Sequence, residues 1–298
     1  MTQPACAFVL PGDVDDPRSP SGGNTYGRRV AAELRASGWA VDATLVPGHW
    51  PRPDAADEAG LARVLAAVPY GGIVLLDGLV ACGVPHVVVP HAARLRLVVL
   101  VHLPLADEVG LPADVAADLD AKERATLRAA AAVVVTSASA AKRLSGHGLA
   151  AVHVAEPGTD AAAHGAGTDG ASALLCVAAV TPVKAHHVLV EALAAVAEQP
   201  WICVCAGPLD RAPDHVARLR ERIRQVGLTE RVRLGGPLDP VALDAAYAAA
   251  DLAVLASTTE TYGMAAAEAL ARGIPVVTTT GGALPRTVGR APDGTRPG

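Results

Sequence analysis

The 298-residue sequence predicts an α/β fold built from two doubly wound parallel sheets. Short apolar runs alternate with longer helical patterns, which is typical of parallel sheets covered by helices on both faces. Hydrophobic residues make up 51% of the chain but aromatic residues only 3%, so the cores must be built from Val, Leu, Ile and Ala. The length also suits two domains of roughly 150 residues each.

The first half of the chain is predicted to alternate strands and helices in a regular order. Each strand is a short run of mostly Val, Leu, Ile and Ala, and each helix repeats apolar residues every three to four positions. A glycine-rich loop with Gly22 and Gly23 separates the first strand from the first helix. The strands are expected at 5–10, 41–46, 72–77, 97–102, 132–136 and 152–156, and the helices at about 25–37, 61–67, 115–130 and 138–145.

The second half repeats this rhythm after a stretch of Gly, Ala, Thr and Asp that lacks periodicity. That composition is typical of a linker, which we place at about 161–171. Residues 1–160 and 172–298 are therefore expected to form two domains, with a central cleft between the carboxyl ends of their sheets. The strands are expected at 173–180, 201–206, 232–234, 252–256 and 275–279, and the helices at about 185–198, 214–226, 240–249 and 262–272.

The segment after Gly281 and Gly282 ends in residues 290–298, which are rich in Gly, Pro and Arg. This composition is typical of a loop. The C-terminal domain is therefore expected to be incomplete, with its sheet lacking the last elements, as in a truncated chain.

Charge and cysteine content bear on the class of protein. The net charge of −5 disfavours nucleic acid as a partner, and the arginines of segment 218–224 are typical of a solvated helix face. The five cysteines are an odd number and lie mostly in apolar runs, which favours reduced, buried thiols in a cytoplasmic protein. Cys203 and Cys205 alternate along a predicted strand, so we expect no metal there.

No segment of the sequence predicts secretion or a membrane span. The N-terminus lacks a basic region followed by an apolar segment and a small-residue cleavage site. No apolar run reaches the roughly 18 residues that a bilayer span requires. We expect a soluble protein, and a transient contact with a membrane surface stays open.

The most informative segment, residues 257–277, runs from the end of a predicted strand through a polar loop into a helix. We expect the backbone N–H groups of Tyr262, Gly263 and Met264 to lack partners at this helix start. Together with the helix dipole they form a site for a phosphate group. Gly263 has no Cβ and lets a ligand approach the backbone closely.

Two glutamates flank this helix start. Glu260 lies in the loop before it, where a carboxylate suits neutral sugar hydroxyls better than a second anion. Glu268 lies eight residues further on, where its carboxylate can accept hydrogen bonds from a diol such as ribose. Either glutamate alone is more simply explained as an ordinary surface charge, but the two together with Gly263 favour a binding site.

This segment resembles the E-x7-E motif of retaining glycosyltransferases of the GT-B fold, in particular the large family 4. The family's pattern usually runs E-x-F/Y-G-x-x-x-x-E-A-x-A-x-G-x-P-V-V, and a match of this length is highly specific. Every fixed position is filled here, by Glu260, Tyr262, Gly263, Glu268, Ala269, Ala271, Gly273, Pro275, Val276 and Val277.

The resemblance extends over nearly the whole chain. Gly22 and Gly23 look like the family's N-terminal glycine pair, and residues 101–104 resemble its H-x-P turn. Residues 156–160 are similar to the P-G-x-D segment before the linker, and residues 250–252 to the alanine-aspartate pair before the glutamate motif. The resemblance therefore implies the GT-B fold, with two Rossmann-like domains.

On the donor side, the resemblance implies a role for each matching residue. Glu260 would contact the donor sugar, Glu268 the ribose, and the amides of residues 262–264 the diphosphate. Lys184 matches the lysine that neutralises the diphosphate as it leaves with extra negative charge. A purely structural role for Lys184 is less attractive, because a cation at a helix start opposes the helix dipole.

Other matching residues are assigned in the same way. Gly22 and Gly23 would let the backbone of the N-terminal domain approach the phosphates, and His102 would face the donor sugar near the reacting carbon. The loop around Gly235 and Gly236 would contact the nucleotide base. For His102, a satisfied histidine at a strand end is the structural alternative.

The resemblance also implies the reaction. A hexose-type sugar would pass from a UDP-, GDP- or ADP-sugar to an acceptor with retention at the anomeric carbon. No metal and no resident cofactor are expected, and no Asp-x-Asp motif is present. The acceptor would be a sugar, a lipid or a small metabolite, bound against the N-terminal domain near Arg28, Arg29 and His102.

The sequence departs from the family pattern around Lys184. The family usually carries an arginine nearby as a second diphosphate cation, but Ala179 and Val183 occupy the candidate positions. The glycine that normally follows the lysine is Ala185, and the one that opens the loop is Ala178. A truncated or degenerate homologue that binds a nucleotide or a partner without catalysis is therefore the alternative.

Two other classes are less favoured. A nicotinamide-dependent enzyme requires a G-x-G-x-x-G turn after the first strand. Residues 11–13 and the pair Gly22 and Gly23 do not supply that turn. Sugar-nucleotide epimerases share the fold and stay as a minor alternative.

Overall fold

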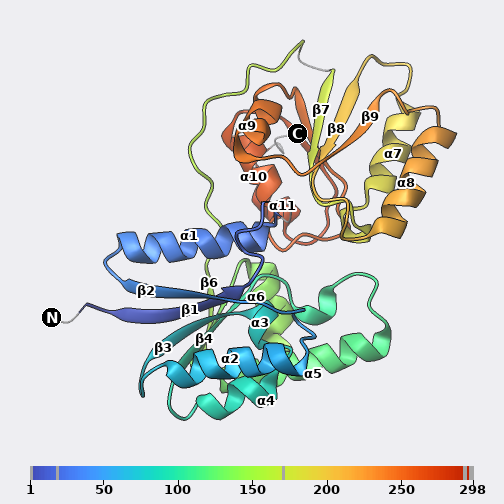
Figure 1. Cartoon of the computed structure of the whole chain (residues 1–298). Helices are drawn as coiled ribbons and strands as arrows, with labels where there is room; N and C mark the ends of the chain where they lie inside the picture. The colour runs from blue at the N-terminus through green and yellow to red at the C-terminus, as the bar shows by residue number, and fades with distance from the viewer. Residues whose placement is uncertain (1–2, 18–19, 170–171, 291–293, 295–298) are drawn as a thin grey trace. The chain divides into compact units, whose positions relative to one another are not determined.

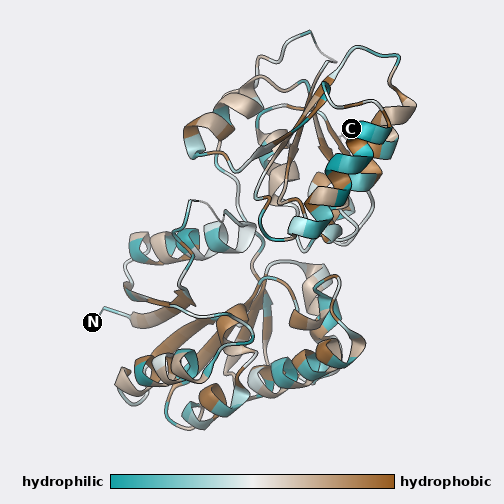
Figure 2. Ribbon diagram, turned by 45° about the vertical axis from the view of Figure 1, so that its right-hand side comes forward, coloured by the Kyte–Doolittle hydropathy of each residue, from teal (hydrophilic) through white to brown (hydrophobic). Residues whose placement is uncertain are grey.

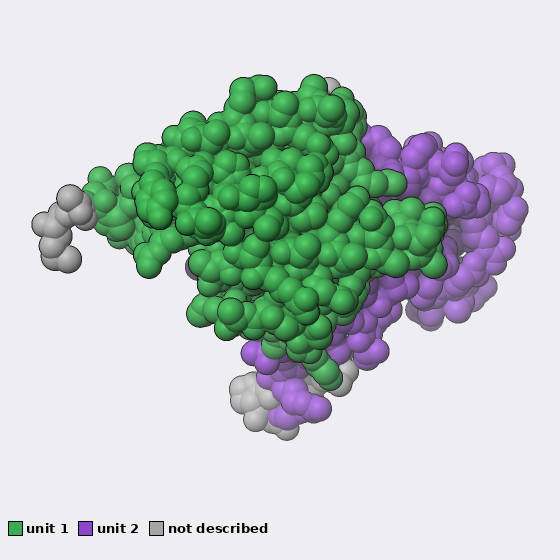
Figure 3. Space-filling view, turned by 90° about the horizontal axis from the view of Figure 1, so that it is seen from below, with its two compact units in different colours: residues 1–16, 21–156 green, residues 17–20, 157–298 purple. Residues whose placement is uncertain are grey.

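The structure, a computed structural model, describes residues 3–17, 20–169, 172–290 and 294. The chain divides into two compact units, residues 1–16 with 21–156 and residues 17–20 with 157–298 (Figures 1 and 3). Each unit is a parallel sheet with helices on both faces, so the predicted α/β class with two doubly wound units is confirmed. Residues 157–169 hold no helix or strand, and the end of the expected linker, 170–171, lies outside the described residues.

The first unit contains a six-stranded parallel sheet in the order β2-β1-β3-β4-β5-β6. Its strands are β1 (Ala5–Pro11), β2 (Ala40–Val46), β3 (Ile73–Asp77), β4 (Arg96–Val101), β5 (Ala132–Val135) and β6 (Val152–Val154). Its helices are α1 (Gly22–Ala36), α2 (Ala55–Ala67), α3 (Gly78–Ala81), α4 (Pro85–Val88), α5 (Ala113–Ala129) and α6 (Ala138–Leu144).

Two apolar clusters fill the two sides of this sheet. Along β1, Val9 faces the larger cluster, which is covered by α2, α4, α5 and α6, whereas Phe8 and Leu10 face the smaller one under α1. This alternation follows from the period of two in a strand. Because both faces are buried, the strands read as nearly continuous apolar runs.

The second unit contains a five-stranded parallel sheet in the order β11-β10-β7-β8-β9. One face packs against α7 and α8, and the other against α9, α10 and α11. Its strands are β7 (Ala173–Val177), β8 (Ile202–Ala206), β9 (Val232–Gly236), β10 (Leu252–Leu255) and β11 (Val276–Thr278). Its helices are α7 (His186–Ala195), α8 (Pro213–Gln225), α9 (Pro240–Ala248), α10 (Met264–Ala271) and α11 (Leu284–Val288).

Helix α8 has the amphipathic character expected from its arginines. Arg218, Arg220 and Arg224 are exposed, while Val216 and Leu219 are buried against the sheet. The hydrophilic outer face of this helix contrasts with the hydrophobic strands (Figure 2). All five cysteines are buried free thiols, as predicted. No helix among the described residues is long and apolar enough to cross a membrane.

Three helix starts differ clearly from the prediction. Helix α2 begins at Ala55 rather than near residue 61, because Asp54 caps it and accepts hydrogen bonds from the Ala56 and Asp57 amides. Helix α1 begins at Gly22 rather than near residue 25, because Ser21 caps it and accepts a hydrogen bond from the Asn24 amide at 3.0 Å. Gly22 and Gly23 therefore belong to the first helical turn and not to a loop before it. Helix α10 begins at Met264 rather than at residue 262, because Gly263 adopts a left-handed conformation with φ of 95°.

Three short helices were not predicted. Helices α3, α4 and α11 span only four or five residues, too few to show a helical repeat in the sequence. Helix α11 lies between Gly282 and the predicted terminal loop, where no element was predicted. Most of the predicted terminal loop, residues 290–298, lies outside the described residues.

Candidate functional site

The polar loop between β10 and α10 contributes Glu260 to a partly buried ion pair. Lys184 Nζ donates to Glu260 Oε1 at 2.5 Å, and Ser257 Oγ donates to the same oxygen at 2.7 Å. The Glu260 side chain is only 11% exposed and that of Lys184 26%. Two residues that were singled out separately in the sequence therefore contact each other directly.

Backbone hydrogen bonds hold the two loops of this ion pair together. The Thr258 amide donates to the Val183 carbonyl oxygen at 2.8 Å, and the Thr258 hydroxyl donates to the same oxygen at 3.1 Å. Lys184 ends a single 3-10 turn, and Ala185 then adopts a left-handed conformation with φ of 46° before α7 begins. A glycine would adopt this conformation without strain. The alanine that replaces the family's usual glycine at position 185 is therefore strained.

Residues at and just before α11 form hydrogen bonds with the loop that contains Glu260. The Ala283 amide donates to the Glu260 carbonyl oxygen at 2.8 Å, and the Thr287 hydroxyl donates to the Tyr262 carbonyl oxygen. A Cβ on Gly282 would lie 2.2 Å from the Glu260 carbonyl oxygen. Only glycine permits this close approach, so Gly282 is required for the packing of this loop.

The start of α10 lies at Met264, two residues after the predicted start at residue 262. Helical positions Met264 and Ala265 are too close to the start to bond within the helix, whereas Ala266 and Ala267 donate to the Gly263 carbonyl oxygen. Gly263 is the cap and Tyr262 precedes it, so the amides at the helix start belong to Met264 and Ala265. The predicted set of residues 262–264 is thus shifted toward the C-terminus.

Glu268 lies in the middle of α10 and is tied to α9. Its Oε2 accepts a hydrogen bond from the Tyr247 hydroxyl at 2.9 Å. Burial raises the pKa of Tyr247 far above its ordinary value, so the phenol remains a proton donor. Sequence reasoning missed Tyr247, because nothing in its surroundings distinguishes it from an ordinary core aromatic residue.

In the first unit, His102 follows β4 and pairs with a carboxylate that sequence reasoning missed. His102 Nε2 lies 3.1 Å from Asp77 Oδ2, and Asp77 is only 3% exposed at the end of β3. Asp77 Oδ1 also accepts from the Leu79 amide at 2.8 Å. Since β3 and β4 are adjacent, the ends of the two strands bring these side chains together.

Helix α1 lies against this histidine. A Cβ on Gly23 would lie 3.4 Å from the His102 ring, and the Tyr26 ring makes an edge contact with it at 5.5 Å. The structure therefore brings Gly23 and His102 together within the first unit, as their joint assignment to one site suggests. Gly22 is exposed beside them, and Arg28 and Arg29 are exposed further along α1.

The loop that follows His102 is anchored by a buried carboxyl group. Glu123 of α5 is 1% exposed, and its Oε1 accepts from the Leu105 amide at 3.2 Å. Burial raises the pKa of Glu123 to about 7. The Leu105 amide is thus held by a carboxyl group whose pKa is raised toward neutral pH.

The glycines expected near the base lie at the carboxyl end of β9. Gly236 has φ of 76°, and its carbonyl oxygen accepts from the Gly207 amide at 2.8 Å. The register between β8 and β9 shifts by one residue at this point, which leaves Gly235 exposed beside the sheet edge. Both glycines lie in the second unit, as do Lys184 and Glu260.

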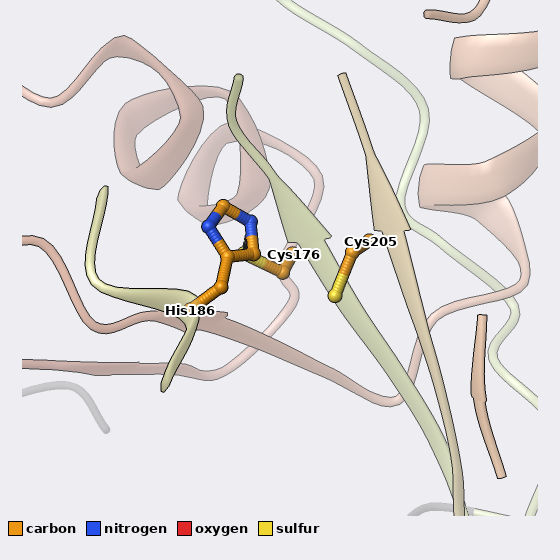
Figure 4. A group of neighbouring side chains, drawn as sticks. All are labelled: Cys176, His186 and Cys205. Carbon is orange, nitrogen blue, oxygen red and sulfur yellow. Dashed lines mark hydrogen bonds between the residues drawn. The ribbon is translucent and has the colours of Figure 1, made fainter. Parts of the chain in front are cut away.

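A cluster of soft ligand atoms lies in the core of the second unit (Figure 4). Each of Cys176, His186 and Cys205 offers one ligand atom, and these three atoms lie within 4.8 Å of one another. Cys176 Sγ lies 3.6 Å from His186 Nε2. The sequence did not indicate this cluster, because its members come from β7, α7 and β8.

The chemistry of this cluster favours a packed thiol–imidazole contact. It offers three donors, whereas structural zinc sites use four. His186 Nδ1 is buried and finds no hydrogen-bond partner among the described residues, although metal-bound histidines almost always donate their second ring N–H. The hydrogen bond with Cys205, together with burial, raises the pKa of the Cys176 thiol.

Known proteins resemble the second unit in sequence. Residues 167–295 match the model of the family Glycosyl transferases group 1. A D-inositol 3-phosphate glycosyltransferase from Salinispora arenicola (strain CNS-205) is 38% identical over 115 residues, which cover 36% of this chain and 26% of that protein. One from Corynebacterium glutamicum (strain R) is 29% identical over 164 residues, 48% of this chain and 38% of that protein. The chain thus spans about a quarter to two fifths of the length of these relatives.

Solved structures resemble nearly the whole chain. A sucrose-phosphate synthase from Thermosynechococcus elongatus has a TM-score of 0.77 at 19% identity, over 96% of this chain and 84% of that chain. Anabaena Alr3699/HepE in complex with UDP and glucose has a TM-score of 0.73 at 19% identity, over 98% and 84% of the two chains. At this identity the likeness establishes the fold, which is the GT-B fold expected from the sequence.

Proposed function

We propose that this chain is a glycosyltransferase of the retaining GT-B family 4, which moves a hexose-type sugar from a nucleoside-diphosphate donor to an acceptor. The observation that carries the proposal is the Lys184–Glu260 pair beside the start of α10. It lies in the unit that matches Glycosyl transferases group 1. The donor is a UDP-, GDP- or ADP-sugar, and the reaction uses neither a bound metal nor a resident cofactor.

The second unit supplies the positive end of the site. When the bond between the sugar and the diphosphate breaks, negative charge accumulates on the leaving diphosphate. The Lys184 ammonium and the Met264 and Ala265 amides are preorganised to stabilise that charge. Glu260 fixes the position of Lys184 before the donor arrives and then contacts the sugar, while Glu268 accepts from the ribose.

In this proposal the imidazole of His102, in the first unit, contacts the donor sugar. A carboxylate can only accept a hydrogen bond, so Asp77 fixes the proton of His102 on Nε2. With one proton on the ring, Nδ1 is the nitrogen left to accept from a sugar hydroxyl. Gly23 packs against the same ring and allows a phosphate to approach the first turn of α1.

The acceptor is a polyol or sugar phosphate, a lipid or another small metabolite. The relatives of the second unit are named for D-inositol 3-phosphate, which makes a polyol phosphate the first acceptor to test.

A second candidate function is nucleotide binding without turnover. The absence of a second cation at Ala179 and Val183 favours it, because one preorganised charge contributes several kcal/mol to a transition state. The two functions predict the same nucleotide affinity but different rates of donor consumption.

Donor consumption therefore tests the proposal. The full chain is incubated with UDP-, GDP- and ADP-glucose, with and without inositol 3-phosphate, and the released nucleoside diphosphate is measured. We expect release from one donor, reduced by roughly 100-fold in Glu260→Ala and unchanged in Glu198→Ala, which alters an exposed glutamate of the same unit. Nucleotide binding without release supports the second candidate, and full activity of Glu260→Ala overturns the role assigned to that carboxylate.

A further inference from the structure

Tyr247 is a large buried side chain that packs against the alanine-rich helix of the proposed donor site. It lies on α9, is 1% exposed, and belongs to an apolar cluster with Ala266 and Ala269 of α10. Those small side chains leave room for an aromatic ring between the two helices. As far as packing is concerned, a phenylalanine would fill this space as well as a tyrosine.

The hydroxyl of Tyr247 therefore needs its own explanation. It donates to Glu268 Oε2 at 2.9 Å, and the Ala265 carbonyl oxygen lies at the longer distance of 3.5 Å. Burying a hydroxyl in an apolar cluster costs free energy unless it forms a hydrogen bond. The bond to the Glu268 carboxylate is charge-assisted, so it is the contact that offsets this cost.

Arg272 holds the tyrosine ring and the helix of Glu268 in one arrangement. Its guanidinium lies 4.6 Å from the centre of the Tyr247 ring. Its Nη1 donates to the Glu268 carbonyl oxygen at 3.1 Å, and its Nη2 donates to Asp244 Oδ1 on α9 at 2.5 Å. Arg272 thus contacts both α9 and α10, and its contact with the ring fixes the position of the Tyr247 phenol relative to Glu268.

We infer that Tyr247 is a positioning residue that aims the Glu268 carboxylate at the ribose of the donor nucleotide. The inference rests on the proposed function, in which Glu268 accepts from the ribose diol. An unrestrained glutamate loses rotamer freedom when it binds a ligand. With Oε2 already held by Tyr247, that loss occurs on folding, and the carboxylate meets the ribose in a preset orientation.

The test is ribose discrimination by Tyr247→Phe in the full chain. Isothermal titration gives the affinities for the tightest-binding of UDP, GDP and ADP and for its 2′,3′-dideoxy analogue. We expect the preference for the ribonucleotide to fall by about fivefold in Tyr247→Phe, with the affinity for the dideoxy analogue unchanged. Tyr70→Phe, which alters a tyrosine that is 84% exposed, should keep the full preference.

Two further variants show whether the effect passes through Glu268. Glu268→Gln should also lose the preference, and adding Tyr247→Phe to it should cause no further loss, because the two residues act as one unit. Arg272→Lys cannot keep both the stacking and the paired hydrogen bonds, and it should reduce the same preference to a smaller extent. The test therefore does not depend on the folding of one variant.

An unchanged preference in Tyr247→Phe overturns the inference while leaving the proposed function standing. An equal loss of affinity for both ligands also overturns it, since that result indicates a general packing role. If the wild-type chain binds none of the three nucleotides, the proposed function fails and the inference fails with it.

Discussion

The ammonium nitrogen of Lys184 lies 2.5 Å from the Glu260 carboxylate, although the two residues are 76 positions apart. Lys184 stands in the loop after β7 and Glu260 in the loop after β10, and these strands are neighbours in the sheet. The backbone hydrogen bond from Thr258 to Val183 fixes the two loops to each other. In the proposed function, a diphosphate at the start of α10 would share Lys184 with Glu260.

Removing this lysine should weaken diphosphate binding. Lys184→Ala deletes the cation and leaves the Glu260 carboxylate partly buried without its ionic partner, which adds repulsion toward an anion. We expect the affinity for a nucleoside diphosphate, measured by isothermal titration, to fall by roughly 10- to 100-fold. Lys142→Ala, which alters an exposed lysine of α6, is the matched control. Equal affinities for the two variants would contradict the role of Lys184.

The carboxylate behind His102 should matter for turnover. In Asp77→Asn the side-chain oxygen can still accept from the Leu79 amide, but the amide nitrogen then faces His102 Nε2 and favours the opposite tautomer. We expect donor turnover to fall by about tenfold or more. Nitrogen NMR of His102 should show the proton moving from Nε2 to Nδ1. Asp42→Asn, at an exposed position, should change neither property, and an Asp77→Asn enzyme with full turnover would disprove the tautomer argument.

Much of this arrangement follows from local sequence patterns. The strands were predictable because both faces of each sheet are buried, so runs such as residues 97–101 are apolar throughout. Glu260 and Glu268 could be singled out because they belong to one recognisable motif. Lys184 could be singled out because it matches the family's lysine in the loop after β7. Their contacts were not predictable, since the pairing of Lys184 with Glu260 depends on which strands are neighbours.

Replacing Gly263 should destabilise the protein, because no side chain fits between this residue and Leu284. It has φ of 95°, and a Cβ there would lie 2.7 Å from Cδ2 of the buried Leu284. Gly110 has nearly the same φ, 93°, with nothing within 4 Å of its Cβ position. Gly110→Ala should therefore cost about 1 kcal/mol of unfolding free energy from backbone strain alone.

Gly263→Ala should cost an additional 1–3 kcal/mol or so, because Leu284 must move within a packed cluster. Urea unfolding of both variants and the wild type measures the difference. Similar losses for Gly110→Ala and Gly263→Ala would mean that the Leu284 contact contributes nothing.

The buried carboxyl of Glu123 predicts a pH dependence of stability. Its pKa is raised to about 7 in the folded protein from an ordinary value of 4.5. Between these values the folded state binds more protons than the unfolded state, so this group's contribution to stability falls as pH rises. Glu123→Gln removes this titration. As the pH rises from 5 to 8, the wild type should therefore lose on the order of 3 kcal/mol of unfolding free energy relative to the variant.

Urea unfolding of the wild type and Glu123→Gln at the two pH values checks this shift. Glu108→Gln, at an exposed position, should show no such change. A difference between wild type and Glu123→Gln that stays constant with pH would show that the buried carboxyl does not titrate as proposed.

The parts of the site that escaped prediction are those that depend on long-range packing. Asp77 and Tyr247 stand in apolar surroundings, and only the folded structure shows that each aims a polar atom at a candidate residue. The shifted start of α10 had a local cause, since a left-handed Gly263 ends the loop two residues later than the helical pattern suggests. The Ser21 cap likewise moved α1 toward the N-terminus.

The central claim is sugar transfer with retention, and proton NMR of the anomeric signals during the reaction tests it most directly. The full chain is mixed with UDP-, GDP- or ADP-glucose and inositol 3-phosphate or a monosaccharide phosphate. We predict that one donor signal decays while a glycoside signal of the same anomeric configuration appears. A glycoside of inverted configuration, or donors that all stay intact with every acceptor, would contradict the account.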